Sequence, residues 1–182
     1  MVTVHGFTTG WITTDRAGLI EGGEGQQRIP VLSYLIEHAK GRLVFDTGLH
    51  QDLRSDARAR LGGLADIFDS VLPTGLAVDE RVGGLSDGVD LIVCSHLHYD
   101  HCGGNAALAE AFGARIVVPA ASADDVRRWD EQALSFAATG QRCERFDAHD
   151  TLSPGDELTM GGLHWRAHAA PGHDPARRIA GR

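Results

Sequence analysis

The chain has 182 residues, of which 42% are hydrophobic and 23% charged, and its formal net charge at pH 7 is −8. This length predicts a single domain, residues 1–182, with a substantial core. The acidic balance argues against nucleic acid as a partner, because phosphate neutralisation needs clustered Lys and Arg. Since no run of about 18 apolar residues indicates a membrane span and no secretory signal is visible, we expect a cytoplasmic protein with no membrane partner.

The first half of the chain carries strand patterns and then a helical pattern. Alternating or β-branched runs predict strands at 1–7, from Trp11 onward, at 31–36 and at 42–45. Apolar spacing over 51–72 predicts two short helices broken at Gly62-Gly63, and another short helix precedes Gly83-Gly84.

The second half alternates strands with helices and ends in a β-meander. The predicted elements are a strand at 91–94, a helix at 106–112, a strand at 115–119, an amphipathic helix at 122–137 capped by Ser122, and meander strands at 144–146, 156–160 and 163–169. This order favours a mixed α/β (α+β) fold with two packed sheets and outer helices.

Three imidazoles and a carboxylate follow the apolar run 91–94 within six positions. His96 and His98, two residues apart near a strand end, would point to the same side. Asp100 and His101 follow in a turn, before Gly103-Gly104 lets the chain change direction. A lone His is usually a satisfied polar residue and a turn Asp usually a cap, but burying all four uncompensated would be costly. The pattern therefore indicates a metal site, suited to zinc or iron.

The string from Ser95 to Asn105, SHLHYDHCGGN, resembles the N-acyl-homoserine-lactonase-like branch of the metallo-β-lactamase fold superfamily. Upstream, residues 43–48 are similar to the family strand that ends in Asp-Thr-Gly, and downstream Ala-Pro-Gly-His at 170–173 resembles its Pro-Gly-His turn. The resemblance implies a four-layer αββα sandwich, of which this chain would hold an incomplete second half.

Carried over by motif, the resemblance implies a ligand set. His96, His98 and His173 would bind one metal, and Asp100 with His101 would contribute to a second. The cofactor would be one or two zinc ions, with iron or manganese as alternatives. Asp46 would orient a ligand imidazole by a hydrogen bond; the alternative, a plain turn Asp after a strand, carries comparable weight.

The resemblance also implies the chemistry of a metal-dependent hydrolase. A metal-bound hydroxide would attack the carbonyl of a small-molecule acyl substrate, a lactone or ester. Asp100 would hold that nucleophile and pass a proton to the leaving oxygen. The alternatives are thioester hydrolysis, iron-dependent oxidation, or a catalytically impaired metal-binding remnant.

After His173 the chain departs from the family pattern. Residues 174–182 contain no later Asp and His for a bridging carboxylate and a last imidazole, apart from Asp174 beside the turn, and we expect an irregular tail. An uncovered sheet edge would favour a homodimer. Cys102 is open to two interpretations, a ligand or nucleophile and a small semi-buried neighbour of the site, of which the second is preferred. His164 and His168 would lie on an exposed strand face.

Overall fold

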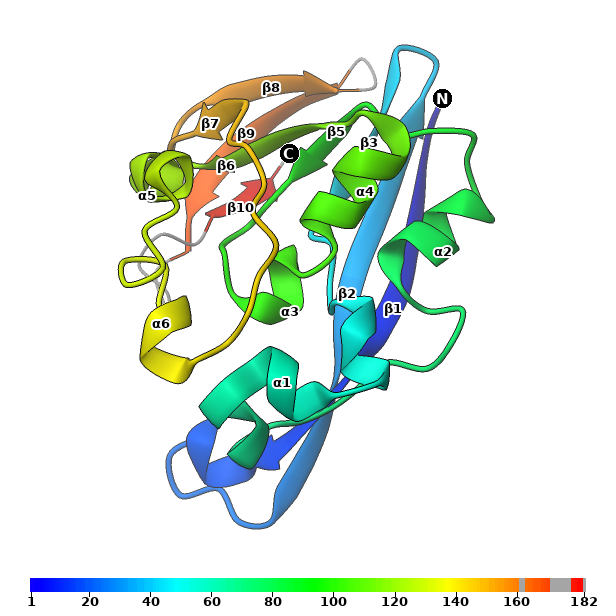
Figure 1. Ribbon diagram of the computed structural model, residues 1–182. Helices are drawn as coiled ribbons and strands as arrows, with labels where there is room; N and C mark the ends of the chain where they lie inside the picture. Colours follow the sequence, from blue (N-terminus) through cyan, green and yellow to red (C-terminus); the bar gives the residue numbers. More distant parts are fainter. Residues whose placement is uncertain (161–162, 171–177, 182) are drawn as a thin grey trace.

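The computed structural model describes residues 1–160, 163–170 and 178–181 (Figure 1). Its strands form one seven-stranded sheet, in the order β4-β1-β2-β3-β5-β6-β7, and one three-stranded sheet, in the order β10-β9-β8. The strands of the large sheet are β1 (Val2–Asp15), β2 (Gln26–His38), β3 (Gly41–Phe45), β4 (Asp69–Val71), β5 (Leu91–Val93), β6 (Arg115–Pro119) and β7 (Asp150–Leu152). Those of the small sheet are β8 (Glu157–Met160), β9 (Leu163–Ala169) and β10 (Arg178–Gly181).

Short helices connect these strands. The α-helices are α1 (Ala57–Leu61), α2 (Val78–Gly83), α3 (Tyr99–Cys102), α4 (Asn105–Phe112), α5 (Ala123–Arg128) and α6 (Phe136–Thr139). The 3-10 turns are η1 (Arg16–Gly18), η2 (Gln51–Arg54), η3 (Gly62–Asp66) and η4 (Ala120–Ser122). Among the described helices, none is both long and apolar enough to cross a membrane.

Alternate residues of the central strands fill two different cores. Val44, Ile92 and Ile116 face the helices, where they pack with buried residues of α2, α4, α5 and α6. Their neighbours Leu43, Val93 and Val117 face the opposite way and pack with residues of the small sheet. This period of two places helices on one face of the large sheet and the small sheet on the other. The described residues thus form helix, sheet and sheet layers of the expected αββα sandwich.

A third core lies at the far end of the long β1–β2 hairpin. Buried residues of β1, β2, η2 and α1 meet there, among them Ile12, Val31, Leu53 and Leu61. Through Leu49 and Leu53, this cluster anchors the segment that follows β3.

Several predicted elements are corrected by the structure. The helix over 122–137 is interrupted, because Trp129 adopts a left-handed φ of 53° that ends α5, and Ser122 makes no capping hydrogen bond. The indole of Trp129 packs on Phe136 and Phe146. Residues 144–146 form no strand. The break at Gly62, by contrast, is confirmed, since this residue has a φ of 56°.

The end of the chain also differs from the irregular tail expected over 174–182. Residues 178–181 pair with β9 in antiparallel register, Arg178 opposite Ala169 and Gly181 opposite Arg166. Backbone pairing does not require alternating apolar side chains, and it satisfies the N–H and C=O groups along that edge of β9. That edge of β9 is therefore paired, and β10 forms an edge of the small sheet in the described part of the chain.

Candidate metal centre

The parallel pairing of β3 and β5 brings two distant segments together. Phe45 lies opposite Val93 in the register, and the Asp46 N–H donates to the Val93 carbonyl at 3.0 Å. Because both strands run in the same direction, the residues after them leave the sheet at the same edge. Asp46 therefore meets Ser95, although 49 positions separate them in the sequence.

Asp46 is the centre of a buried hydrogen-bond network. Its Oδ1 accepts the Ser95 N–H at 2.7 Å, and its Oδ2 accepts the Ser95 hydroxyl at 2.7 Å. The same Oδ2 lies 2.8 Å from Nδ1 of His101. A carboxylate can only accept in this contact, so Nδ1 of His101 carries a proton and donates to it. Asp46 has a left-handed φ of 55°, a conformation that Asp tolerates better than most residues.

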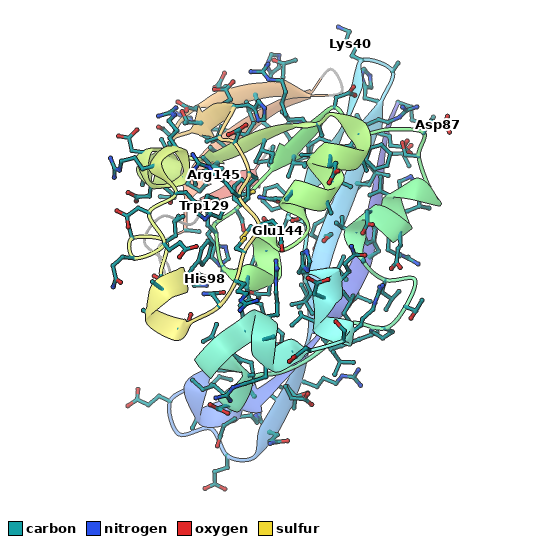
Figure 2. The ribbon with its side chains drawn as sticks, viewed as in Figure 1. Lys40, Asp87, His98, Trp129, Glu144 and Arg145 are labelled. Atoms are coloured by element: carbon teal, nitrogen blue, oxygen red, sulfur yellow. The ribbon has the colours of Figure 1, made fainter. Side chains whose placement is uncertain are left out.

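The three imidazoles of the motif gather beside this network. The ring of His96 lies 4.6 Å from that of His98 and 4.0 Å from that of His101, measured between centroids. Asp100 joins them, with Oδ2 3.4 Å from Nε2 of His101. His96 is completely buried, whereas His98, Asp100 and His101 are partly exposed, and Figure 2 labels His98.

The turn after Asp46 is tied to the motif helix. The Thr47 N–H donates to the His101 carbonyl at 2.7 Å, and its hydroxyl donates to Asn105 Oδ1 at 2.8 Å. The glycine pair Gly103-Gly104 is needed for this close approach and not for a left-handed turn, since both φ angles are negative. A Cβ at Gly103 would lie 2.6 Å from the Gly48 carbonyl oxygen. Close approach, and not the conformational freedom expected from the sequence, is therefore what requires glycine here.

The donor set fits a transition metal. The described residues bring together His96, His98, Asp100 and His101, which offer imidazole nitrogens and a carboxylate oxygen, the ligands of zinc and iron sites. The hydrogen bond from His101 to Asp46 is the kind of outer contact that fixes a ligand imidazole. His173, the remaining predicted ligand, lies outside the described residues.

A second group of possible donors lies nearby. His50, Asp52 and Glu144 place ligand atoms within 4.8 Å of one another. Two contacts oppose a cation there. Both terminal nitrogens of the Arg60 guanidinium donate to the Glu144 carboxylate, and the Asp52 N–H donates to Nδ1 of His50 at 3.1 Å. The positive guanidinium and the occupied Nδ1 make this cluster an ion-pair network.

Burial and charge shift the titration of this network. Burial, reinforced by the positive charge of Arg60, lowers the pKa of His50 below its usual value. Burial alone would raise the pKa of Glu144, but the hydrogen bonds and charge of Arg60 outweigh it and lower that pKa. Nε2 of His50 lies 3.1 Å from Glu144, so the neutral imidazole donates to the carboxylate. His50, which showed no useful spacing in the sequence, is thus a structural residue; no sequence signal links it to residues 60 and 144.

Cys102 has the properties of a packed thiol. It is 1% exposed, and its Sγ lies 3.5 Å from the Leu97 carbonyl oxygen. A hydrogen bond with the Cys143 thiol, together with burial, raises the pKa of Cys102 well above the usual range. Because the thiolate is the nucleophile and the ligand, these contacts favour the interpretation of Cys102 as a small buried neighbour.

Comparison with known proteins shows the family of this chain. Residues 27–177 match the model of the metallo-beta-lactamase superfamily. The N-acyl homoserine lactonase AttM of Azorhizobium caulinodans is 33% identical over 86 residues, which cover 46% of this chain and 33% of the relative. An N-acyl homoserine lactonase of Bacillus cereus is 24% identical over 156 residues, which cover 82% of this chain and 57% of the relative.

A solved structure shows the same fold. An N-acyl homoserine lactone hydrolase, with N-hexanoyl-L-homoserine at its catalytic metal centre, superposes with a TM-score of 0.72 at 18% identity. The match covers 97% of this chain and 68% of that one. In the AttM lactonases, the region that this chain matches spans about a third of the protein. Since the family model covers most of this sequence, the chain belongs to the metallo-beta-lactamase superfamily.

Proposed function

We propose that this chain carries the metal-binding part of a hydrolase that opens lactone or ester-type acyl bonds of small molecules. The observation that carries the proposal is the buried carboxylate of Asp46, which holds Nδ1 of His101 beside two further imidazoles. The names of the curated relatives, N-acyl homoserine lactonases, supply the substrate class.

In this proposal the residues have separate tasks. His96, His98 and His173 hold one metal, and Asp100 with His101 contributes to a second. Zinc is the first candidate, with iron or manganese as alternatives. A bound transition metal supplies a Lewis acid and lowers the pKa of water toward neutrality.

The chain's own groups orient and move protons around this centre. Asp46 accepts a hydrogen bond from Nδ1 of His101, and this contact orients the ring so that Nε2 faces Asp100. Asp100, partly exposed, is placed to accept a hydrogen bond from the attacking water and to return a proton to the leaving oxygen of the opened ring.

The test is a ring-opening assay. Purified chain loaded with zinc is mixed with N-hexanoyl-homoserine lactone, and ring opening is followed by acid release. We expect turnover that Asp100→Asn reduces by about 10²-fold or more, while metal analysis shows that the variant still binds at least one equivalent. Asp87→Asn, a substitution in the loop between α2 and β5, is the matched control and should leave turnover unchanged.

Two results would contradict the proposal. If the protein holds no zinc after dialysis against zinc, the proposed metal centre is wrong. Equal ring opening by the chain and by Asp100→Asn would place the activity elsewhere. Metal binding without ring opening would identify the chain as a binding-competent but catalytically impaired member of the superfamily.

A further inference from the structure

Ser95 lies between the buried carboxylate and the first histidine of the motif. Its hydroxyl oxygen is 2.7 Å from Asp46 Oδ2 and 3.0 Å from Nδ1 of His96. Ser95 is 2% exposed and His96 0% exposed. Bulk water has no access to this contact, and the serine hydroxyl lies within hydrogen-bond distance of both Asp46 and His96.

The hydroxyl has one hydrogen and three neighbours, Asp46 Oδ2, Nδ1 of His96 and, at 3.5 Å, Nδ1 of His101. Nδ1 of His101 already donates its own proton to Asp46, so two of the three can receive the serine hydrogen. The carboxylate is the charged acceptor and the nearer of the two, and charge-assisted hydrogen bonds are roughly twice as strong as neutral ones. The hydrogen of Ser95 therefore goes to Asp46. Nδ1 of His96 must then donate to the serine oxygen, which leaves the lone pair of His96 on Nε2.

The same carboxylate oxygen also receives Nδ1 of His101. Asp46 thus acts on one imidazole directly and on the other through a hydroxyl. Both rings carry their proton on Nδ1 and present Nε2 as the possible ligand atom. Without the hydroxyl, Asp46 would still orient His101 but would have no contact of this kind with His96.

We propose that Ser95 is a positioning residue, which relays the charge of Asp46 to His96 and fixes the tautomer of that imidazole. The step from tautomer to metal affinity rests on the proposed role of His96 as a ligand. A ligand imidazole with its other nitrogen held by an oriented partner binds metal more tightly, and loss of such a partner typically costs 10–100-fold in affinity.

The first measurement needs no metal. Long-range ¹H–¹⁵N correlation spectra of metal-free protein report which ring nitrogen of His96 is protonated. We expect the Nδ1–H tautomer in the natural chain and a loss of that preference in Ser95→Ala, while His101 keeps its tautomer. An Nε2–H tautomer for His96 in the natural chain would overturn the proposal, whatever happens to any variant.

The second measurement is zinc affinity by competition with a chromophoric chelator. We expect Ser95→Ala to bind about 10–100-fold more weakly and Ser95→Thr, which keeps the hydroxyl, to recover most of the loss. The matched control is Ser33→Ala, a buried serine of β2 whose hydroxyl lies 3.5 Å from Thr9, and it should bind as the natural chain does.

The two measurements separate this inference from the proposed function. If the natural chain binds no zinc, the metal centre fails while the tautomer spectra still decide the relay. If Ser95→Ala binds zinc within about threefold of the natural chain, or if it keeps His96 as Nδ1–H, the relay is wrong even though the centre binds metal.

Discussion

The pair formed by Arg60 and Glu144 offers a sharp test of the ion-pair interpretation. The Arg60 side chain is 7% exposed and that of Glu144 is 44% exposed, and the guanidinium donates to both carboxylate oxygens. Glu144→Gln removes the negative charge but keeps the shape and one carbonyl acceptor. The substitution leaves the guanidinium buried beside a neutral amide.

The expected cost lies between two reference values. Removing one partner of a fully buried pair costs about 3–5 kcal/mol, whereas exposed pairs contribute about 0–1 kcal/mol. Because water reaches Glu144 but hardly reaches Arg60, we expect a loss of about 2 kcal/mol in the free energy of unfolding. For a chain of this size that corresponds to a decrease of about 4–8 °C in Tm.

Urea unfolding near neutral pH measures this loss, and a surface pair provides the control. Arg58 and Asp66 also form an ion pair, but their side chains are 63% and 64% exposed. Asp66→Asn should therefore cost less than about 0.5 kcal/mol. Equal losses in Glu144→Gln and Asp66→Asn would refute the reasoning. Adding Arg60→Met to Glu144→Gln should recover stability, because no charge then remains buried without a partner.

Three further predictions concern the surroundings of the centre. Gly48→Ala should cost more than about 2 kcal/mol in thermal unfolding, because its φ is +67° and the added Cβ would lie 1.8 Å from Thr9 Oγ1; Gly75→Ala, with a φ of +82° and open space around it, should cost only about 1–2 kcal/mol. His50→Gln should flatten the pH dependence of stability. Because the pKa of His50 is lowered in the folded protein, its contribution is full above about pH 6.5 and is lost as the pH falls toward the folded pKa. Urea unfolding across this window would contradict the prediction if the free energy of unfolding changed with pH equally in both proteins. Cys143, the partly exposed thiol among the described cysteines, should react first with a disulfide reagent in the native protein, and the other two only after unfolding; three equally fast thiols would be the opposite result.

The sequence predicted the strands that carry the site because their patterns are local. The apolar run 91–94 and the strand that ends before Asp46 are visible in the chain, and the structure has them as the neighbours β5 and β3. The histidine motif comes directly after the second of these strands in the sequence. The Asp46 contact with His101 is present in the structure, in line with the expected orienting hydrogen bond.

What the sequence could not predict depends on distant contacts or on single dihedral angles. The helical spacing over 122–137 contains no sign that Trp129 would adopt a left-handed φ and pack against Phe146. Of the two ionic partners of His50, Asp52 is two residues away but Glu144 lies 94 positions further along the chain. Ser95 stood in the motif string, but its role requires a hydroxyl placed between a carboxylate and a ring, which only the pairing of two strands creates.

The parallel register of β3 and β5 also has a consequence for folding. The contacts from Asp46 to Ser95 and to His101 close loops of 49 and 55 positions, so their entropic cost is met only when the two strands pair. Proteins dominated by contacts of this range fold more slowly than proteins dominated by local turns and helices. A metal ion that prefers this arrangement would bind the closed sheet far better than the open chain. The rate of metal binding during refolding would therefore report when the large sheet has formed.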